Sequence, residues 1–244
     1  MKHVSIDRNH TIMYEEFGAG DIVILLPSLF LSSYSYRHIA ESLSRFYKII
    51  IPNLHRNNST YLSVAKTTAD YGKELDVFIR KLNLHHFHVI GFSFSTILIM
   101  KYIADYPQSA DRIILVSTTL SPEKIKYKLW TLIKGYTLLI THNLYSLQGI
   151  RLNLLWLRDG IQFLIHHPHQ LFADISIALC ESDFSRIEIT KPIKIFHATK
   201  DEFLPSNLPV KKVENVEVEN IHDYHAWFFL DEERFIEKVR KFFK

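Results

Sequence analysis

The stretch that decides the fold is Val89-Ile90-Gly91-Phe92-Ser93-Phe94-Ser95-Thr96, in the first half of the 244-residue chain. Residues 86–90 read as a short strand, and residues 96–103 continue as a buried helix. The segment between them, residues 91–95, therefore predicts a tight turn with Ser93 at its apex.

A serine at the apex of a strand–turn–helix unit is the arrangement called a nucleophile elbow, normally written G-x-S-x-G. A hydroxyl is a weak nucleophile, and such a turn holds it clear of the backbone, where a general base can reach it. The turn crowds the residues two before and two after the serine, and the small residues Gly91 and Ser95 stand there. The helix that follows directs N–H groups at the site, which favours developing negative charge. The alternative interpretation is an ordinary turn between a strand and a helix of a parallel sheet.

Composition and charge restrict the class of protein. Apolar residues make up 47% of the chain and charged residues 23%, which is ordinary for a globular domain. A net charge of +3 is too small to indicate nucleic-acid binding. The single cysteine, Cys180, excludes an internal disulfide and is interpreted as a packing residue. Since no secretory signal and no apolar run of about eighteen residues occur, we expect a cytoplasmic protein without a transmembrane segment.

Apolar runs alternate with amphipathic segments along most of the chain. Strands are expected at residues 2–6, 11–17, 22–26, 47–51, 86–90, 112–117, 193–197 and 216–221. Helices are expected at residues 33–46, 67–82, 96–103 and 231–243. The first two strands are expected to pair in antiparallel fashion. The alternation that follows predicts an α/β fold with a doubly wound, mostly parallel sheet.

The pattern changes between residues 118 and 190, where no strand is indicated and leucine-rich, aromatic helices are expected. We interpret residues 119–190 as a helical cap inserted into a core formed by residues 1–118 and 191–244. The alternative is that these helices are ordinary core. A cap needs an inner face, so part of this apolar surface is expected to line a pocket.

Two later segments complete the pattern. Asp201 follows a late strand, within His197-Ala198-Thr199-Lys200-Asp201, and His225 follows the last strand. With Ser93 earlier in the chain, the order serine, aspartate, histidine resembles that of the α/β-hydrolase fold family. The resemblance covers nearly the whole chain outside the expected cap.

The resemblance implies a catalytic triad, and the chemistry of the residues agrees with it. Ser93 is the expected nucleophile, His225 the general base and Asp201 the residue that orients the histidine. The backbone N–H groups of Leu29 and Phe94 are the expected oxyanion hole. No cofactor and no metal are implied.

Neighbouring residues offer alternatives for two of these roles. His222 is the nearest rival of His225 as the base, but its spacing to the closing helix fits the family less well. An acid after the strand that ends at Ser117 is less favoured, because no carboxylate occurs there before Glu123. Glu202, adjacent to Asp201, is expected to point elsewhere.

The chain departs from the family where glycine is usual. The positions concerned are Ser28, Ser95, Ala198 and Tyr224, and the whole chain has only 7 glycines. Three of these replacements are small, so the architecture is expected to tolerate them. Their effect is expected on the geometry of the oxyanion hole.

The predicted function is that of a serine hydrolase acting on a carboxylic ester or thioester with an apolar acyl group. An acyl-enzyme would form on Ser93 and be hydrolysed by a water that His225 activates. Two alternatives remain: a non-catalytic homologue that binds a small molecule in the same pocket, and a carbon–carbon-bond hydrolase that uses the same triad.

A basic stretch suggests a partner. Between residues 121 and 160 only two acidic residues, Glu123 and Asp159, accompany Lys124, Lys126, Lys128, Lys134, Arg151 and Arg158. A solvated surface is the simpler interpretation. The more specific interpretation is that the basic side chains recognise an anionic carrier such as acyl carrier protein, with a carrier-linked methyl ester as a speculative substrate.

Overall fold

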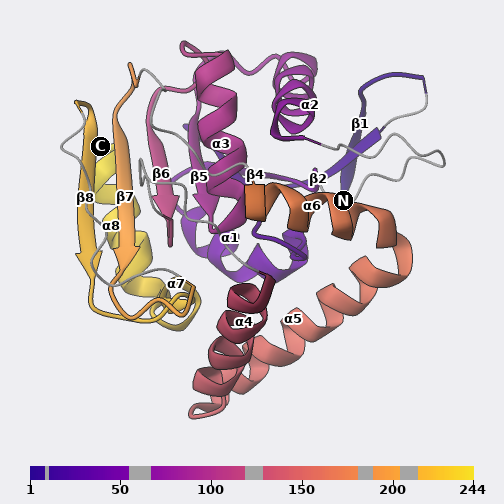
Figure 1. Ribbon diagram of the computed structural model, residues 1–244. Coiled ribbons are helices and arrows are strands. Elements are labelled where there is room, and N and C mark those ends of the chain that lie inside the picture. The colour runs from indigo at the N-terminus through magenta and orange to yellow at the C-terminus, as the bar shows by residue number, and fades with distance from the viewer. Residues whose placement is uncertain (9–10, 55–66, 119–128, 181–188, 204–213) are drawn as a thin grey trace.

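Figure 1 shows the computed structural model, which describes residues 1–8, 11–54, 67–118, 129–180, 189–203 and 214–244. The strands described are β1 (Lys2–Ser5), β2 (Thr11–Phe17), β3 (Ile22–Leu26), β4 (Lys48–Pro52), β5 (His88–Phe92), β6 (Ile113–Val116), β7 (Ile193–Ala198) and β8 (Val216–Ile221). The helices described are the 3₁₀ helix η1 (Ser33–Tyr36), α1 (Arg37–Leu43), α2 (Thr68–Lys81), α3 (Phe94–Asp105), α4 (Leu129–Asn143), α5 (Leu147–His166), α6 (Pro168–Cys180), α7 (Trp227–Leu230) and α8 (Glu232–Phe243).

The described strands form one sheet in the order β1-β2-β4-β3-β5-β6-β7-β8. β2 pairs in antiparallel fashion with both β1 and β4. From β4 to β8 every neighbouring pair is parallel. The predicted doubly wound, mostly parallel sheet is therefore confirmed.

Local side-chain chemistry explains where the helices begin. Thr67 and Asp70 form a reciprocal capping box at the start of α2, close to the predicted boundary. The single helix predicted over residues 33–46 is wrong in detail, because the chain forms η1 and then the short α1. Serine hydroxyls compete with a regular helix here, and Ser32 accepts a hydrogen bond from the backbone N–H of Tyr34 at 3.2 Å. The helix α7 was not expected from the sequence.

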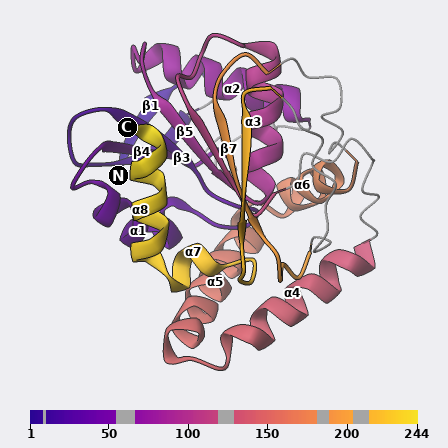
Figure 2. The ribbon, with the colours of Figure 1, turned by 90° about the vertical axis from the view of Figure 1, so that its left-hand side faces the viewer.

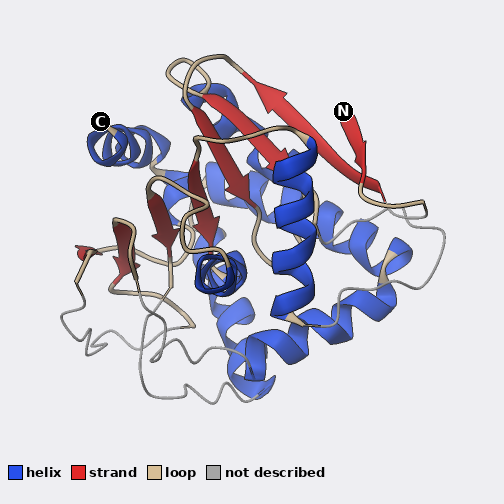
Figure 3. Cartoon of the chain, turned by 90° about the horizontal axis from the view of Figure 1, so that it is seen from above, coloured by secondary structure: helices blue, strands red, loops and turns tan. Residues whose placement is uncertain are grey.

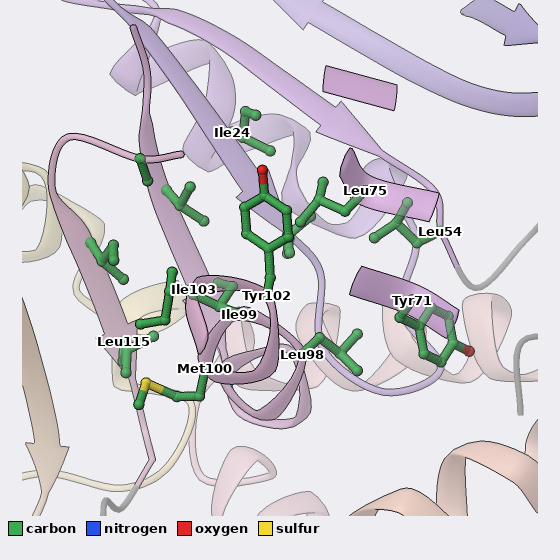
Figure 4. Close-up of a cluster of buried hydrophobic side chains, with 14 of the residues drawn as sticks. Ile24, Leu54, Tyr71, Leu75, Leu98, Ile99, Met100, Tyr102, Ile103 and Leu115 are labelled. Atoms are coloured by element: carbon green, nitrogen blue, oxygen red, sulfur yellow. The ribbon is translucent and has the colours of Figure 1, made fainter. Parts of the chain in front are cut away.

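Helices cover both faces of the sheet, as Figure 3 shows. One hydrophobic core lies between the sheet and the pair α2 and α3, where Leu75, Ile99 and Tyr102 pack with strand residues Ile24 and Leu115 (Figure 4). A second core lies on the other face, against α1 and α8. These two cores fix β5 in the middle of the sheet, so the position after its last residue is rigidly placed.

The helices α4, α5 and α6 follow β6 and precede β7 in the chain, as the sequence predicted for this region. In Figures 1 and 2, α4 and α5 lie below the sheet, beyond the carboxyl ends of the parallel strands. We propose that they belong to the cap of residues 119–190, of which residues 119–128 and 181–188 lie outside the described part. Within the described residues, no helix combines the length and apolar content needed to cross a lipid bilayer.

Candidate active site

Ser93 occupies the turn between β5 and α3, where the sequence places it. Its backbone has φ 50° and ψ −114°, a conformation that is rare for a residue with a side chain. Ser93 is half-buried and lies on the wall of a cavity. The turn therefore presents the hydroxyl at the edge of the sheet, next to open space.

The small residues on either side of Ser93 lie in tightly packed surroundings. A Cβ atom on Gly91 would lie 2.3 Å from Cδ1 of Ile99 and 3.4 Å from backbone atoms of Ser95. Ser95 is fully buried, and its hydroxyl donates a hydrogen bond to the carbonyl oxygen of Pro27. Ser95, at a usual glycine position, thus links the elbow to the loop that follows β3.

The two residues expected to supply the oxyanion hole lie beside Ser93. Leu29 and Phe94 line the same cavity, and Phe94 is the first residue of α3. The neighbouring N–H of Ser28 donates a hydrogen bond to the hydroxyl oxygen of Tyr36 at 3.1 Å, which holds the loop in place. Within the described residues no hydrogen bond is found for the N–H of Leu29.

His225 and Asp201 form a buried pair. Nδ1 of His225 lies 2.7 Å from Oδ2 of Asp201, and the carboxylate side chain is completely inaccessible. The other carboxylate oxygen accepts a hydrogen bond from the backbone N–H of Phe203 at 2.8 Å. Burial lowers the pKa of His225, but the charge and hydrogen bond of Asp201 and the charge of Glu202 raise it, and the net pKa lies above the usual 6.5.

The backbone of His225 is held at both of its polar groups. Its N–H donates to the carboxylate of Glu202 at 3.0 Å, and its carbonyl oxygen accepts from the hydroxyl of Ser117 at 2.7 Å. The second oxygen of Glu202 lies 2.7 Å from Nδ1 of His142, on α4. Glu202 thus binds the histidine backbone and α4, and the imidazole of His225 pairs with Asp201.

Ser93 and His225 line the same cavity, but no hydrogen bond joins their side chains in the described residues. Such bonds are often long without substrate and shorten when it binds. His222, the alternative base, is exposed, and its Nδ1 lies 3.2 Å from the hydroxyl oxygen of Thr199. The geometry therefore favours His225 over His222.

The cavity beside Ser93 has a volume of about 530 Å³ and mostly apolar walls. The α4 and α5 helices supply much of the lining, and Phe30, Ile97 and Phe228 contribute from the rest of the chain. The indole N–H of Trp156, in the lining, is buried and makes no hydrogen bond within the described residues. No group of three or more His, Cys, Asp or Glu side chains placed to hold a metal ion occurs in that part of the chain.

The sequence did not reveal the contacts that three residues make with His225, and Glu202, expected to point elsewhere, is one of them. Ser117 and Glu202 bind backbone atoms, and a backbone contact leaves no spacing motif in the sequence. Phe203 packs edge-on against the imidazole at 4.7 Å between ring centres. Its aromatic side chain two residues after Asp201 was the available signal.

Comparison with known proteins agrees with this architecture. A model of the α/β-hydrolase fold matches residues 21–136. Comparison with curated proteins finds no match. A bromoperoxidase from Bacillus anthracis has a TM-score of 0.78 and 18% sequence identity, with 99% of both chains covered.

Two further solved structures are similar over the whole chain. A meta-cleavage product hydrolase from Pseudomonas fluorescens IP01 has a TM-score of 0.74 and 18% identity, covering 100% of this chain and 97% of that one. An esterase from Exiguobacterium antarcticum has a TM-score of 0.74 and 16% identity, covering 96% and 95%. At this level of identity the similarity shows the fold, and the reaction has to be argued from the site.

Proposed function

Because the chain belongs to the α/β-hydrolase fold family, we propose that it is a serine hydrolase that cleaves a carboxylic ester or thioester with an apolar acyl group. One observation carries this proposal. A strained serine and a histidine that pairs with a buried aspartate line one apolar cavity.

In the proposed first step, Nε2 of His225 takes the proton of the Ser93 hydroxyl as Oγ attacks the carbonyl carbon of the substrate. The carbonyl oxygen becomes an oxyanion, which the N–H groups of Leu29 and Phe94 stabilise. The tetrahedral intermediate collapses as the bond to the leaving group breaks. The leaving alcohol or thiol takes the proton from His225, and the acyl group remains on Ser93.

In the second step, His225 takes a proton from water, and the resulting hydroxide attacks the acyl-enzyme. The acid leaves as the proton returns to Oγ of Ser93. Asp201 holds the Nδ1 side of the imidazole, so Nε2 is the atom left for proton transfer. Its charge also stabilises the imidazolium that forms in both steps, which is consistent with the raised pKa of His225.

The acyl group is proposed to be apolar because the cavity walls are. A polar acyl group would lose hydration there without gaining enough hydrogen bonds. The reaction is proposed to take place in the cytoplasm, which the single cysteine favours.

Recognition of acyl carrier protein is a narrower alternative within this proposal. It is supported by the exposed side chains of Lys134, Arg151 and Arg158, whereas Lys124, Lys126 and Lys128 lie outside the described residues. The dependence of turnover on ionic strength tests this recognition. Turnover of a carrier-linked ester should fall with added salt, and turnover of a small neutral ester should not.

The test of the proposed function is hydrolysis of esters and thioesters of increasing acyl length by the wild type and by Ser93→Ala. We expect turnover by the wild type and a loss of at least roughly a thousandfold in the variant, since triad residues act as a unit. Cleavage of a carbon–carbon bond next to a carbonyl, without ester turnover, would favour the carbon–carbon hydrolase. Absence of any turnover by folded protein would favour a binding homologue.

A further inference from the structure

The surface of α4, α5 and α6 is strongly apolar. The described residues include 17 large hydrophobic side chains that are exposed, and 13 of them lie between residues 129 and 180. Single exposed hydrophobic side chains are normal, but a gathering of this size marks a surface that binds something.

A substrate in the cavity would cover only part of this surface. Seven of these side chains, among them Leu144 and Leu154, line the cavity next to Ser93. The other six do not line it: Trp130, Ile133, Tyr145, Leu147, Ile165 and Phe172. A second apolar contact is needed to account for these six.

The turn between α4 and α5 concentrates three such side chains. Leu144, Tyr145 and Leu147 are 56%, 85% and 78% exposed. The turn is tightly closed, because the hydroxyl of Ser146 accepts the N–H of Gly149 at 2.9 Å, and a Cβ on Gly149 would lie 2.1 Å from a backbone oxygen. Figures 1 and 2 both show this turn at the lower edge of the molecule, away from the sheet.

The charges beside the apolar side chains have one sign. Lys134, Arg151 and Arg158 are exposed, and no salt bridge joins them to a carboxylate in the described residues. The two carboxylates of α5 and α6, Asp159 and Asp174, are 3% and 0% exposed. Asp159 is buried against the hydroxyls of Ser32 and Ser35. The exposed formal charges of α4–α6 are therefore all positive in the described part.

We propose that the turn of residues 144–147, with the adjoining exposed faces of α4 and α5, docks on the surface of an anionic lipid bilayer. Leu144, Tyr145 and Leu147 would enter the boundary between headgroups and acyl chains. Arg151 lies one helical turn beyond Leu147 and would reach the lipid phosphates. Large apolar side chains with basic neighbours are the pattern of helices that bind membranes in this way.

Two other occupants fit the surface less well. An acidic carrier protein would be held mainly by charge, but among the described residues of α4–α6, 13 exposed apolar side chains accompany three exposed Lys and Arg side chains. A second copy of this chain in a two-fold dimer would bring the same positive surface against itself. A bilayer accepts the apolar side chains and supplies the opposite charge.

Docking would also indicate the source of the acyl group, an inference that rests on the proposed function. Leu144 belongs both to the exposed turn and to the cavity lining, so the docked surface is continuous with the walls beside Ser93. The acyl group cleaved would then be that of a lipid, entering the cavity from the bilayer.

The test is flotation of the whole protein with vesicles of phosphatidylcholine, with and without phosphatidylserine. We expect wild-type protein to float with the vesicles that contain phosphatidylserine. Tyr145→Ser combined with Leu147→Ser should weaken binding by at least about tenfold, since both side chains would lose burial in the interface. Arg151→Glu should weaken binding only to the anionic vesicles. Lys81→Glu, at the end of α2 on the opposite side of the molecule, is the matched charge control and should bind as the wild type does (Figure 1).

Hydrolysis of a short-chain ester and the melting temperature are measured on the same variants. Loss of flotation in Tyr145→Ser/Leu147→Ser with both quantities retained supports docking. Absence of flotation of folded wild-type protein overturns it, as does capture by an acidic carrier protein alone or a dimer that the double variant dissociates. Flotation needs no catalysis, so failure of the proposed function would leave a positive flotation result standing.

Discussion

The carboxylate of Glu202 accepts the backbone N–H of His225 at 3.0 Å, while its second oxygen meets His142 of α4 at 2.7 Å. The Glu202 side chain is 1% exposed, so its charge acts on His225 with little screening by solvent. One buried carboxylate therefore joins the proposed general base to a helix of the proposed cap.

This contact predicts a shift in the pH profile. Glu202→Gln keeps the size of the side chain but removes a negative charge that raises the pKa of His225. Because the base acts in its neutral form, activity should rise with pH through this pKa, and the midpoint of kcat/KM against pH should move to lower pH in the variant. Glu233→Gln removes the same charge from the exposed start of α8, and its profile should match the wild type. An unshifted profile in Glu202→Gln would show that its charge does not act on the base.

The choice between the two histidines is tested by two alanine variants. His225→Ala should lower kcat by at least roughly a thousandfold, because triad members act as a unit. His222→Ala should have little effect, since that side chain is exposed and its one hydrogen-bond partner within the described residues is Thr199. If His222→Ala is the inactive variant, His222 and not His225 is the base.

Ser95 should matter for the rate more than its position outside the triad suggests. Ser95→Ala removes the hydrogen bond to Pro27, which connects the elbow with the Leu29 loop. We expect kcat to fall by up to about tenfold with KM little changed, the scale of one buried hydrogen bond that positions a donor. Ser44→Ala is the control, because Ser44 makes a similar bond to the carbonyl of Glu41 at 2.6 Å on the surface. Equal effects of the two variants on kcat would argue against a link to the oxyanion hole.

Two helix glycines should respond oppositely to alanine. A Cβ on Gly135 of α4 would lie 2.4 Å from the Phe203 ring, whereas a Cβ on Gly160 of α5 would have no atom within 4 Å. Gly135→Ala should therefore destabilise the fold by about 1–3 kcal/mol through overpacking. Gly160→Ala should stabilise it by up to about 1 kcal/mol, because alanine is the better helix former. Denaturant unfolding of both variants measures these changes, and a stable Gly135→Ala would mean that α4 does not pack on Phe203 as described.

The sequence predicted the architecture well because local residue patterns determine most of its strands and turns. The apolar runs of β3, β5 and β7 and the turn at Ser93 are set by residues close in sequence. The helix predicted over residues 33–46 was wrong at its start, where residues distant in the sequence form hydrogen bonds with this segment. Asp159 of α5 accepts hydrogen bonds from Ser32 and Ser35, and no local pattern can reveal a partner more than a hundred residues away.

The same distinction applies to the site. Ser93, Asp201 and His225 come after the ends of strands, and apolar runs in the sequence predict those ends clearly. Their catalytic roles stay a proposal. The supports of His225 could not be predicted, because Ser117 and Glu202 bind its backbone. The burial of Asp159 was not predicted either. Its position in the sequence groups this residue with the charges of the expected cap surface.

Covalent labelling shows whether Ser93 is an activated nucleophile. Folded protein is treated with a fluorophosphonate, which forms a stable phosphonyl ester with an activated serine, and the modified residue is identified by peptide mass spectrometry. If Ser93 is activated by His225, a single adduct forms on Ser93 that is absent in Ser93→Ala and forms far more slowly in His225→Ala. A folded protein without an adduct on Ser93, or one labelled equally fast in His225→Ala, would contradict activation of Ser93 by His225.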